Sequence, residues 1–170
     1  MSRAVLSIGS NVGDSLAHLQ SVVDGLGDRV LALSPVYSTA PWGGVEQQDF
    51  LNAVIVVDDP AADGYGWLRR GQRFEAEADR VRVERWGPRT LDVDVVTCDE
   101  VRSDDPELTL PHPRAHERAF VLIPWLDVEP EAVLPVDGEI IRVEALLALL
   151  DEHERAGVHR TRLALKRRSR

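Results

Sequence analysis

The residues best suited to chemistry lie at positions 85–94, in the order Arg-Trp-Gly-Pro-Arg-Thr-Leu-Asp-Val-Asp. Acidic and apolar residues alternate at the end of this stretch, so a strand there places Asp92 and Asp94 on one face, with their Cα atoms about 6.6 Å apart. Two carboxylates at that spacing can share one or two cations, and such oxygen ligands suit Mg²⁺ with its waters and substrate phosphates. Arg85 and Arg89 add guanidinium groups that bind phosphate or carboxylate. The stretch therefore indicates a site for a metal-bound polyphosphate.

These residues also have purely structural interpretations. An Asp-x-Asp pair on a half-exposed strand is often solvated surface, and Gly87-Pro88 is often only a turn. His112 and His116 are four residues apart and suggest a zinc site with the two aspartates, but that set lacks a third nitrogen or sulfur ligand. Other features of the chain therefore have to distinguish a functional site from ordinary solvated surface.

Hydrophobic patterning predicts six elements that would position these residues. The apolar runs indicate strands at residues 4–8, 30–38, 50–57 and 91–97, and helices at residues 16–26 and 67–79. This order is the ferredoxin-like β-α-β-β-α-β pattern, an antiparallel sheet with helices packed on it. We therefore predict an α+β fold followed by a C-terminal extension. In the extension, Pro113 is well placed as a first helical residue, and residues 143–150 have the pattern of an amphipathic helix.

The composition is that of a single globular domain. The chain has 170 residues, of which 44% are hydrophobic and 29% charged, enough to bury a core. No apolar run is long enough for a membrane span, and there is no signal-peptide pattern at the start. Cys98 is the single cysteine and can form no internal disulfide, which favours a reducing compartment. We expect a cytoplasmic monomer with no membrane partner.

The net charge of −9 is unevenly distributed, because residues 155–170 hold seven Arg or Lys and no Asp or Glu. Residues 1–154 form an acidic body, which is a poor surface for nucleic acid because binding to nucleic acid depends on neutralising its phosphates. We therefore expect no nucleic-acid partner. The basic segment is typical of a solvated, frayed terminus. We predict a domain at residues 1–154 and a basic C-terminal tail at residues 155–170.

Two further features favour a functional site over ordinary solvated surface. Asn52 stands in a strand expected to be buried on both faces, so it either braces the adjacent loop or contacts a ligand. Arg80, Arg82, Arg85 and Arg89 form a local positive cluster just before the aspartate pair. No Walker loop or G-x-G-x-x-G motif is present to bind phosphate instead.

Four motifs in register make the chain recognisable. They are Gly9-Ser10-Asn11-Val12-Gly13-Asp14, Tyr37-Ser38-Thr39-Ala40-Pro41 with Asp49-Phe50-Leu51-Asn52-Ala53, the stretch at residues 85–94, and Leu110-Pro111-His112-Pro113 with Arg118-Ala119-Phe120-Val121-Leu122. In that order and spacing they strongly resemble the 6-hydroxymethyl-7,8-dihydropterin pyrophosphokinases of folate biosynthesis. The resemblance spans about residues 4–150.

The resemblance implies that pyrophosphate is transferred from ATP to the hydroxymethyl group of 6-hydroxymethyl-7,8-dihydropterin, with release of AMP. It implies two Mg²⁺ ions held by Asp92 and Asp94, which would bridge the triphosphate oxygens. Arg80 and Arg82 match mobile-loop arginines that close over ATP. The catalytic residues that the resemblance implies are Arg80, Arg82, Arg89, Asp92 and Asp94.

The resemblance also assigns the two substrates. The residues implied to contact ATP are Gln72, Glu75, Arg89, His112 and Arg118. The residues implied to contact the pterin are Thr39, Trp42, Phe50, Asn52, Trp86 and Phe120. Among these, the two phenylalanines sandwich the ring and Thr39 and Asn52 bond its edge. Core packing is the alternative for Phe120, and a structural turn is the alternative for His112.

Two other functions fit parts of the pattern. A ferredoxin-like sheet also serves in RNA recognition, but the aromatic motif of those strands is missing and the body is acidic. A metal-dependent phosphohydrolase would use the same aspartate pair, and ATP consumption without pterin would favour it.

Overall fold

A computed structural model describes residues 2–40, 48–79 and 90–167, and the structural statements below concern those residues. The elements of the central sheet and its first two helices are β1 (Arg3–Ser10), α1 (Ser15–Leu26), the 3₁₀ turn η1 (Gly27–Arg29), β2 (Val30–Leu33), β3 (Tyr37–Thr39), β4 (Phe50–Asp58), α2 (Gly64–Asp79) and β5 (Asp92–Cys98). The later elements are β6 (Ser103–Asp105), β7 (Leu108–Leu110), the 3₁₀ turn η2 (Ala115–Glu117), α3 (Ala119–Val128), β8 (Val133–Val136), β9 (Glu139–Arg142), α4 (Val143–Leu149), α5 (Glu152–Ala156) and β10 (Val158–Arg160).

The central sheet has the strand order β10-β3-β4-β1-β5, with β2 also paired to β4, and every pairing is antiparallel. The single strand predicted at residues 30–38 is divided into β2 and β3, because Pro35 has no amide hydrogen to donate to a ladder. Ser34 bridges the break, since its N–H donates to Val54 O at 3.0 Å and its Oγ accepts from Val54 N at 2.9 Å. The strand order is otherwise that of the predicted pattern.

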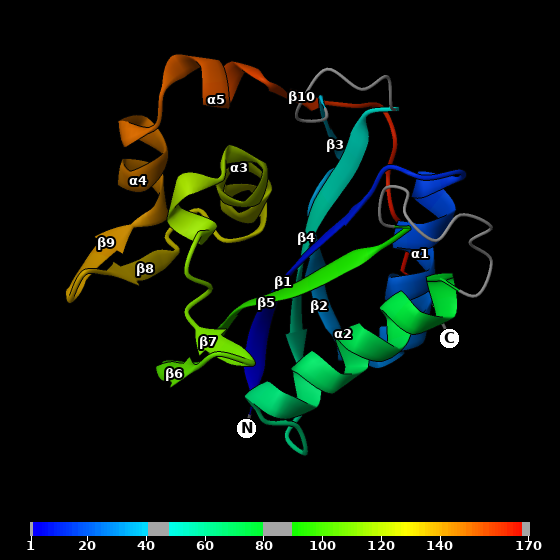
Figure 1. The fold of residues 1–170 in the computed structure, drawn as a ribbon, viewed down its shortest axis with the longest axis horizontal. Helices are drawn as coiled ribbons and strands as arrows, with labels where there is room; N and C mark the ends of the chain where they lie inside the picture. The colour runs from blue at the N-terminus through cyan, green and yellow to red at the C-terminus, as the bar shows by residue number, and fades with distance from the viewer. Residues whose placement is uncertain (1, 41–47, 80–89, 168–170) are drawn as a thin grey trace.

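Helices cover both faces of the sheet, with α1 and α2 on one side and α3 and α4 on the other (Figure 1). Strand β4 is therefore buried on both faces, as its apolar run predicted. Ile55 and Val57 pack toward α1 and α2, whereas Val54 and Val56 pack toward α3 and α4. This two-sided burial makes the sheet a rigid platform for the side chains at its edge.

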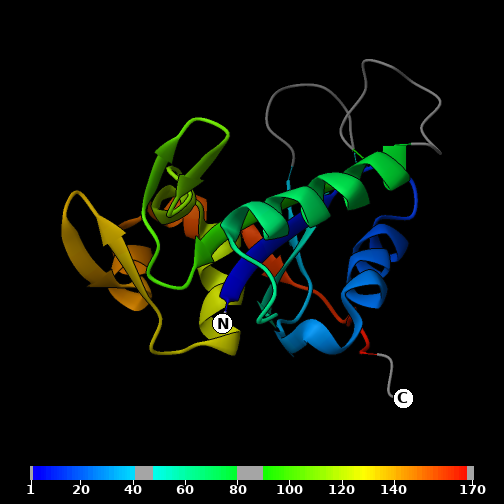
Figure 2. The same cartoon turned by 90° about the horizontal axis from the view of Figure 1, so that it is seen from below.

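The C-terminal extension differs from its prediction in two ways. Pro113 begins no helix, and the chain instead forms η2 and then α3, which starts at Ala119. The expectation of a frayed terminus is also wrong up to residue 166, because β10 pairs with β3 and Leu165, 8% exposed, packs into the core. Gln20 of α1 bonds Lys166 through N–H···O contacts of 2.7 and 2.9 Å, and this segment runs beside α1 in Figure 2. No helix within the described residues is long and apolar enough to span a membrane.

Candidate active site

The aspartate pair lies on one face of β5, as the alternation predicted. Val93 and Val95 are buried in the core with α1 and α2, while Asp92 and Asp94 are half-buried and line a cavity on the opposite face. The physical reason is the two-residue period of a strand, which assigns alternate side chains to opposite faces. Both carboxylates therefore reach the same cavity.

This cavity, of about 480 Å³, brings together seven of the predicted site residues. They are Thr39, Phe50, Asn52, Asp92, Asp94, Arg118 and Phe120. It is lined by β3 and β4 on one side, by β1 and β5 below, and by the start of α3 opposite. The residues come from segments far apart in the chain and meet because the sheet pairs the strands and α3 packs on the same face.

The strand register explains how the polar residues share a face. Gly9 of β1 is paired with Asn52 of β4 on one side and with Asp92 of β5 on the other. Ser7 is paired with Asp94 in the same way. Directly paired residues of antiparallel strands project to the same face, so Asn52 and Asp92 form one polar row with Gly9 between them, and Asp94 projects from the same face beside Ser7.

Asn52 is held in place from two directions. Its side-chain Nδ2 donates to Thr39 Oγ1 at 2.9 Å, and a Cβ atom on Gly9 would lie only 2.9 Å from its Oδ1. The residue is 4% exposed, so this bond pairs a buried amide with a hydroxyl at the end of β3. Asn52 therefore contacts the end of β3 and also lines the cavity.

A cation and a histidine lie at the α3 side of the site. The guanidinium carbon of Arg118 is 5.6 Å from the centroid of the Phe120 ring, within the range of a cation–π contact. His112 N donates to Val96 O at 2.8 Å, which holds the histidine against β5. Burial lowers the pKa of His112, while the nearby Asp94 carboxylate opposes that shift. Its Nδ1 accepts from Arg114 N at 3.2 Å, so the neutral ring carries its proton on Nε2.

Residues 5–130 match the family model described as 7,8-dihydro-6-hydroxymethylpterin-pyrophosphokinase. The chain belongs to this family. Curated relatives carry the name 2-amino-4-hydroxy-6-hydroxymethyldihydropteridine pyrophosphokinase. The Mycobacterium leprae protein is 57% identical over 176 residues, covering 98% of this chain and 92% of the relative. The Mycobacterium tuberculosis protein is 54% identical over 167 residues, covering 93% and 89%.

Solved structures agree with the fold. A crystal structure of Plasmodium falciparum HPPK-DHPS superposes with a TM-score of 0.62 over 86% of this chain. This chain spans 45% of that fusion protein, and at 14% identity the likeness shows the fold alone. The predicted α+β ferredoxin-like class is confirmed. Family membership makes the chain a transferase of folate biosynthesis, a pyrophosphokinase that moves pyrophosphate from ATP to 6-hydroxymethyl-7,8-dihydropterin.

Some residues that the family motif singled out lie elsewhere. Gln72 and Glu75 lie on α2, across the sheet from the cavity, and neither lines it. Glu75 Oε2 accepts from Val93 N at 3.0 Å, which satisfies an amide of the edge strand that carries the aspartates. The remaining predicted residues, Trp42, Arg80, Arg82, Trp86 and Arg89, lie outside the described residues.

The donor set fits magnesium better than zinc. Among the described residues there is no group of three or more His, Cys, Asp or Glu side chains placed to hold a metal. Mg²⁺ is commonly held by one or two carboxylates while substrate phosphates and waters complete its octahedron. The Asp92 and Asp94 pair at the cavity wall matches that requirement, whereas a zinc site favours several nitrogen or sulfur ligands, and the described residues that line the cavity include no His or Cys.

Sequence reasoning missed several residues of the cavity wall. They are Ser7, Gly9, Ala40, Arg114, Glu117 and Glu154, together with Ile8. Gly9 could have been found, because it opens the first family motif and the register places it beside Asn52. Glu154 carried no signal, because its neighbours in the sequence form an ordinary charged run.

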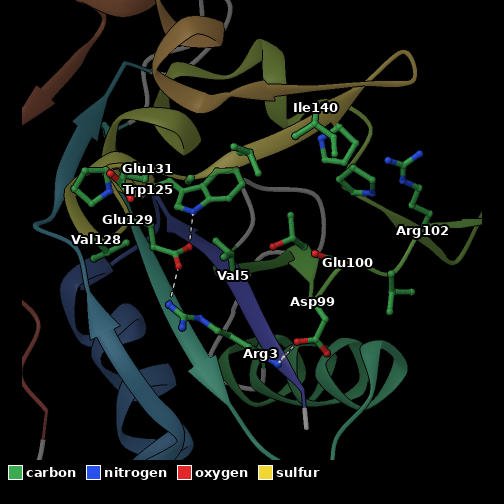
Figure 3. Close-up of a pocket in the computed structure, with 17 residues that line it drawn as sticks. Arg3, Val5, Asp99, Glu100, Arg102, Trp125, Val128, Glu129, Glu131 and Ile140 are labelled. Atoms are coloured by element: carbon green, nitrogen blue, oxygen red, sulfur yellow. Dashed lines mark hydrogen bonds and ion pairs between the residues drawn. The ribbon is translucent and has the colours of Figure 1, made fainter.

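A second and larger cavity, of about 960 Å³, lies toward the other end of the same sheet face, between β5, α3 and the β8–β9 hairpin. Figure 3 shows Arg3 and Trp125 both directed at Glu129, which accepts from them at 2.7 and 2.9 Å. Pro111 comes from one of the family motifs, but none of the described residues predicted to contact a substrate or metal lines this cavity. The two cavities therefore have to be distinguished by the residues that line them and not by their volumes.

Proposed function

We propose that the cavity between β5 and α3 is the active site of this pyrophosphokinase, and that it holds the pterin against the phosphates of ATP. One observation carries the proposal: two phenyl rings, a hydrogen-bonded amide and two carboxylates line one volume of about 480 Å³. A heteroaromatic ring needs flat apolar faces with a few polar groups at its edge. A metal-bound triphosphate needs hard oxygen ligands and cations.

The pterin is assigned to the part of the cavity between β4 and α3. Phe50 projects from the start of β4 and Phe120 from the first turn of α3, so a flat ring can stack between them. Asn52 and Thr39 stand at the edge of that space, joined by their own hydrogen bond. The paired amide and hydroxyl have a defined orientation, which favours one ring orientation over its flipped alternative.

The triphosphate is assigned to the part of the cavity beside β5. Asp92 and Asp94 would hold two Mg²⁺ ions, which when bound neutralise phosphate charge and polarise the reacting phosphoryl group. Arg118 supplies a fixed positive charge on the facing wall. His112 donates from Nε2, because its Nδ1 is already occupied by Arg114 N. In this arrangement the pterin hydroxymethyl oxygen attacks the β-phosphorus and AMP leaves.

The other family assignments are retained as part of the proposal. Arg80, Arg82 and Arg89 supply further phosphate contacts and close the site against water, which would otherwise hydrolyse ATP. Trp42 and Trp86 extend the apolar enclosure of the pterin. The family resemblance alone assigns Gln72 and Glu75 to the outer, nucleoside end of ATP, because neither residue lines the cavity.

The nucleotide product tests the proposal most directly. Purified protein is incubated with Mg²⁺, ATP and the reduced pterin, and nucleotides are separated by ion-exchange chromatography. AMP formed in equal amount to the pyrophosphorylated pterin supports it. ADP as the product, or ATP consumption that is independent of pterin, would instead indicate a different phosphotransfer, including the phosphohydrolase alternative.

We also propose that the protein acts as a cytoplasmic monomer, and that its catalytic domain comprises residues 1–154 together with the following segment, which pairs with β3 and packs into the core. Sedimentation velocity at micromolar concentration tests the first point, because a single species near the mass of one chain is expected. A second species that grows with concentration contradicts it. The location is tested by fractionating a cell lysate, because a cytoplasmic protein should leave the activity in the fraction from which membranes have been removed.

A further inference from the structure

Glu154 of α5 connects the C-terminal extension to the wall of the active-site cavity. Its Oε1 accepts a hydrogen bond from Ala119 N at 3.2 Å, and the same side chain lines the cavity. The two residues are 35 positions apart in the sequence. The bond is therefore a tertiary contact that only the fold creates.

The contact falls where α3 needs one. A helix leaves its first backbone N–H groups without intrahelical partners, and the capping position of α3, Arg118, makes no side-chain cap bond. Ala119 is 0% exposed, so water cannot readily replace the missing acceptor. The Glu154 carboxylate fills this role from another element, and its negative charge is also favourable beside the positive end of the helix.

The segment after Glu154 is attached to the opposite wall. Val158 pairs with Thr39, and Arg160 pairs with Tyr37, as β10 adds an edge strand to β3. Thr161 closes the segment, because its N and Oγ1 both donate to Val36 O, at 3.0 and 2.8 Å. Figure 1 shows α5 near α3 and leading directly into β10 beside β3. One short segment thus ties the start of α3 to the strand that carries Thr39.

We propose that Glu154 is a positioning residue for the pterin. By capping α3 it sets the distance and angle of Phe120 relative to Thr39 and Asn52, the groups assigned to the edge of the ring. Glu154 acts through α3 and the substrate-binding residues, without a chemical role in phosphoryl transfer. This inference rests on the proposed placement of the pterin in the cavity.

Steady-state kinetics of two Glu154 variants test it. Glu154→Ala removes the acceptor, and the KM for the pterin is expected to rise about fivefold, the usual effect of losing one hydrogen bond. The kcat and the KM for ATP should stay within about twofold. Glu154→Gln keeps a side-chain oxygen that can accept from Ala119 N and should restore most of the pterin KM. Glu152→Ala changes an exposed carboxylate on the same helix and is the matched control.

Coupling to Phe120 separates positioning from general stability. In a Phe120→Ala background, adding Glu154→Ala should leave the pterin KM unchanged, because the ring that Glu154 positions is already absent. Additive effects of the two changes would overturn the inference, as would a lowered melting temperature with no change in the pterin KM. If the pterin does not bind in this cavity, Phe120→Ala alone would leave the pterin KM unaltered. That result distinguishes failure of the proposed site from failure of the role proposed for Glu154.

Discussion

The carboxamide of Asn52 lies directly against the α-carbon of Gly9, so that a Cβ atom at position 9 would be 2.9 Å from Asn52 Oδ1. Real Cβ atoms do not approach an oxygen so closely without displacing it. Gly9 is paired with both Asn52 and Asp92 across the sheet. A glycine at this position therefore leaves room for the Asn52 amide to sit in the row of polar groups that faces the cavity.

Gly9→Ala is expected to weaken pterin binding. The added methyl group pushes the Asn52 amide away and breaks its bond to Thr39, a loss that corresponds to about three- to tenfold in the pterin KM. The KM for ATP should change less. Gly66→Ala introduces the same methyl group on α2, where its nearest neighbour is 3.4 Å away, and should leave both constants unchanged. Equal constants for Gly9→Ala and wild type would contradict the role of the close contact.

Replacing either Asp92 or Asp94 by asparagine should lower kcat by about a hundredfold or more, the scale of losing one preorganised electrostatic contact in a transition state. The side chains keep their size, so the melting temperature should change little. A titration of activity against Mg²⁺ concentration should shift to higher concentration in both variants. Asp104→Asn, on the exposed β6–β7 hairpin, is the control. Wild-type rates in either site variant would exclude a metal-binding role for that carboxylate.

The contact between α2 and β5 depends on Gly71, because a Cβ atom there would lie 3.0 Å from Val93 Cγ1 and 3.4 Å from Val93 O. Gly71→Leu overfills this interface and should reduce the unfolding free energy by about 1–3 kcal/mol. Val93 stands between the two aspartates, so kcat should fall as well. Ala76→Leu adds the same side chain to an exposed position of the same helix. A variant at position 71 as stable as wild type would show that the interface is loosely packed.

Tyr37 gives the protein a pH-dependent contribution to stability. Its hydroxyl donates to Asp127, and burial together with that carboxylate raises the pKa of Tyr37 to about 12. A pKa above the unfolded value of about 10 means that this contribution is complete below pH 10 and lost as the pH rises through 12. Urea unfolding between pH 9 and 12 should therefore lose stability more steeply in wild type than in Tyr37→Phe. Parallel curves for the two proteins would rule out the contribution.

The local elements follow from the chain because they depend on neighbouring residues. The alternation at residues 91–95 predicts that Asp92 and Asp94 share a face, and the apolar run at residues 50–57 predicts a strand buried on both sides. Both are confirmed. The break at Pro35 was visible as an irregularity, but its effect was not, because Ser34 bonds a residue 20 positions away.

The sequence by itself determined which chemical groups are available and in what order the strands and helices follow one another along the chain. Motif spacing also identified the family, and therefore the reaction. The tertiary structure alone decided that Gly9 makes room for Asn52, that Glu75 faces the edge of β5, and that Glu154 caps α3. Each of these contacts joins residues at least 18 positions apart, and no local pattern encodes which distant backbone group a side chain will meet. The basic C-terminal segment is the clearest case, because its composition predicts a solvated end and its backbone instead completes the sheet beside Thr39.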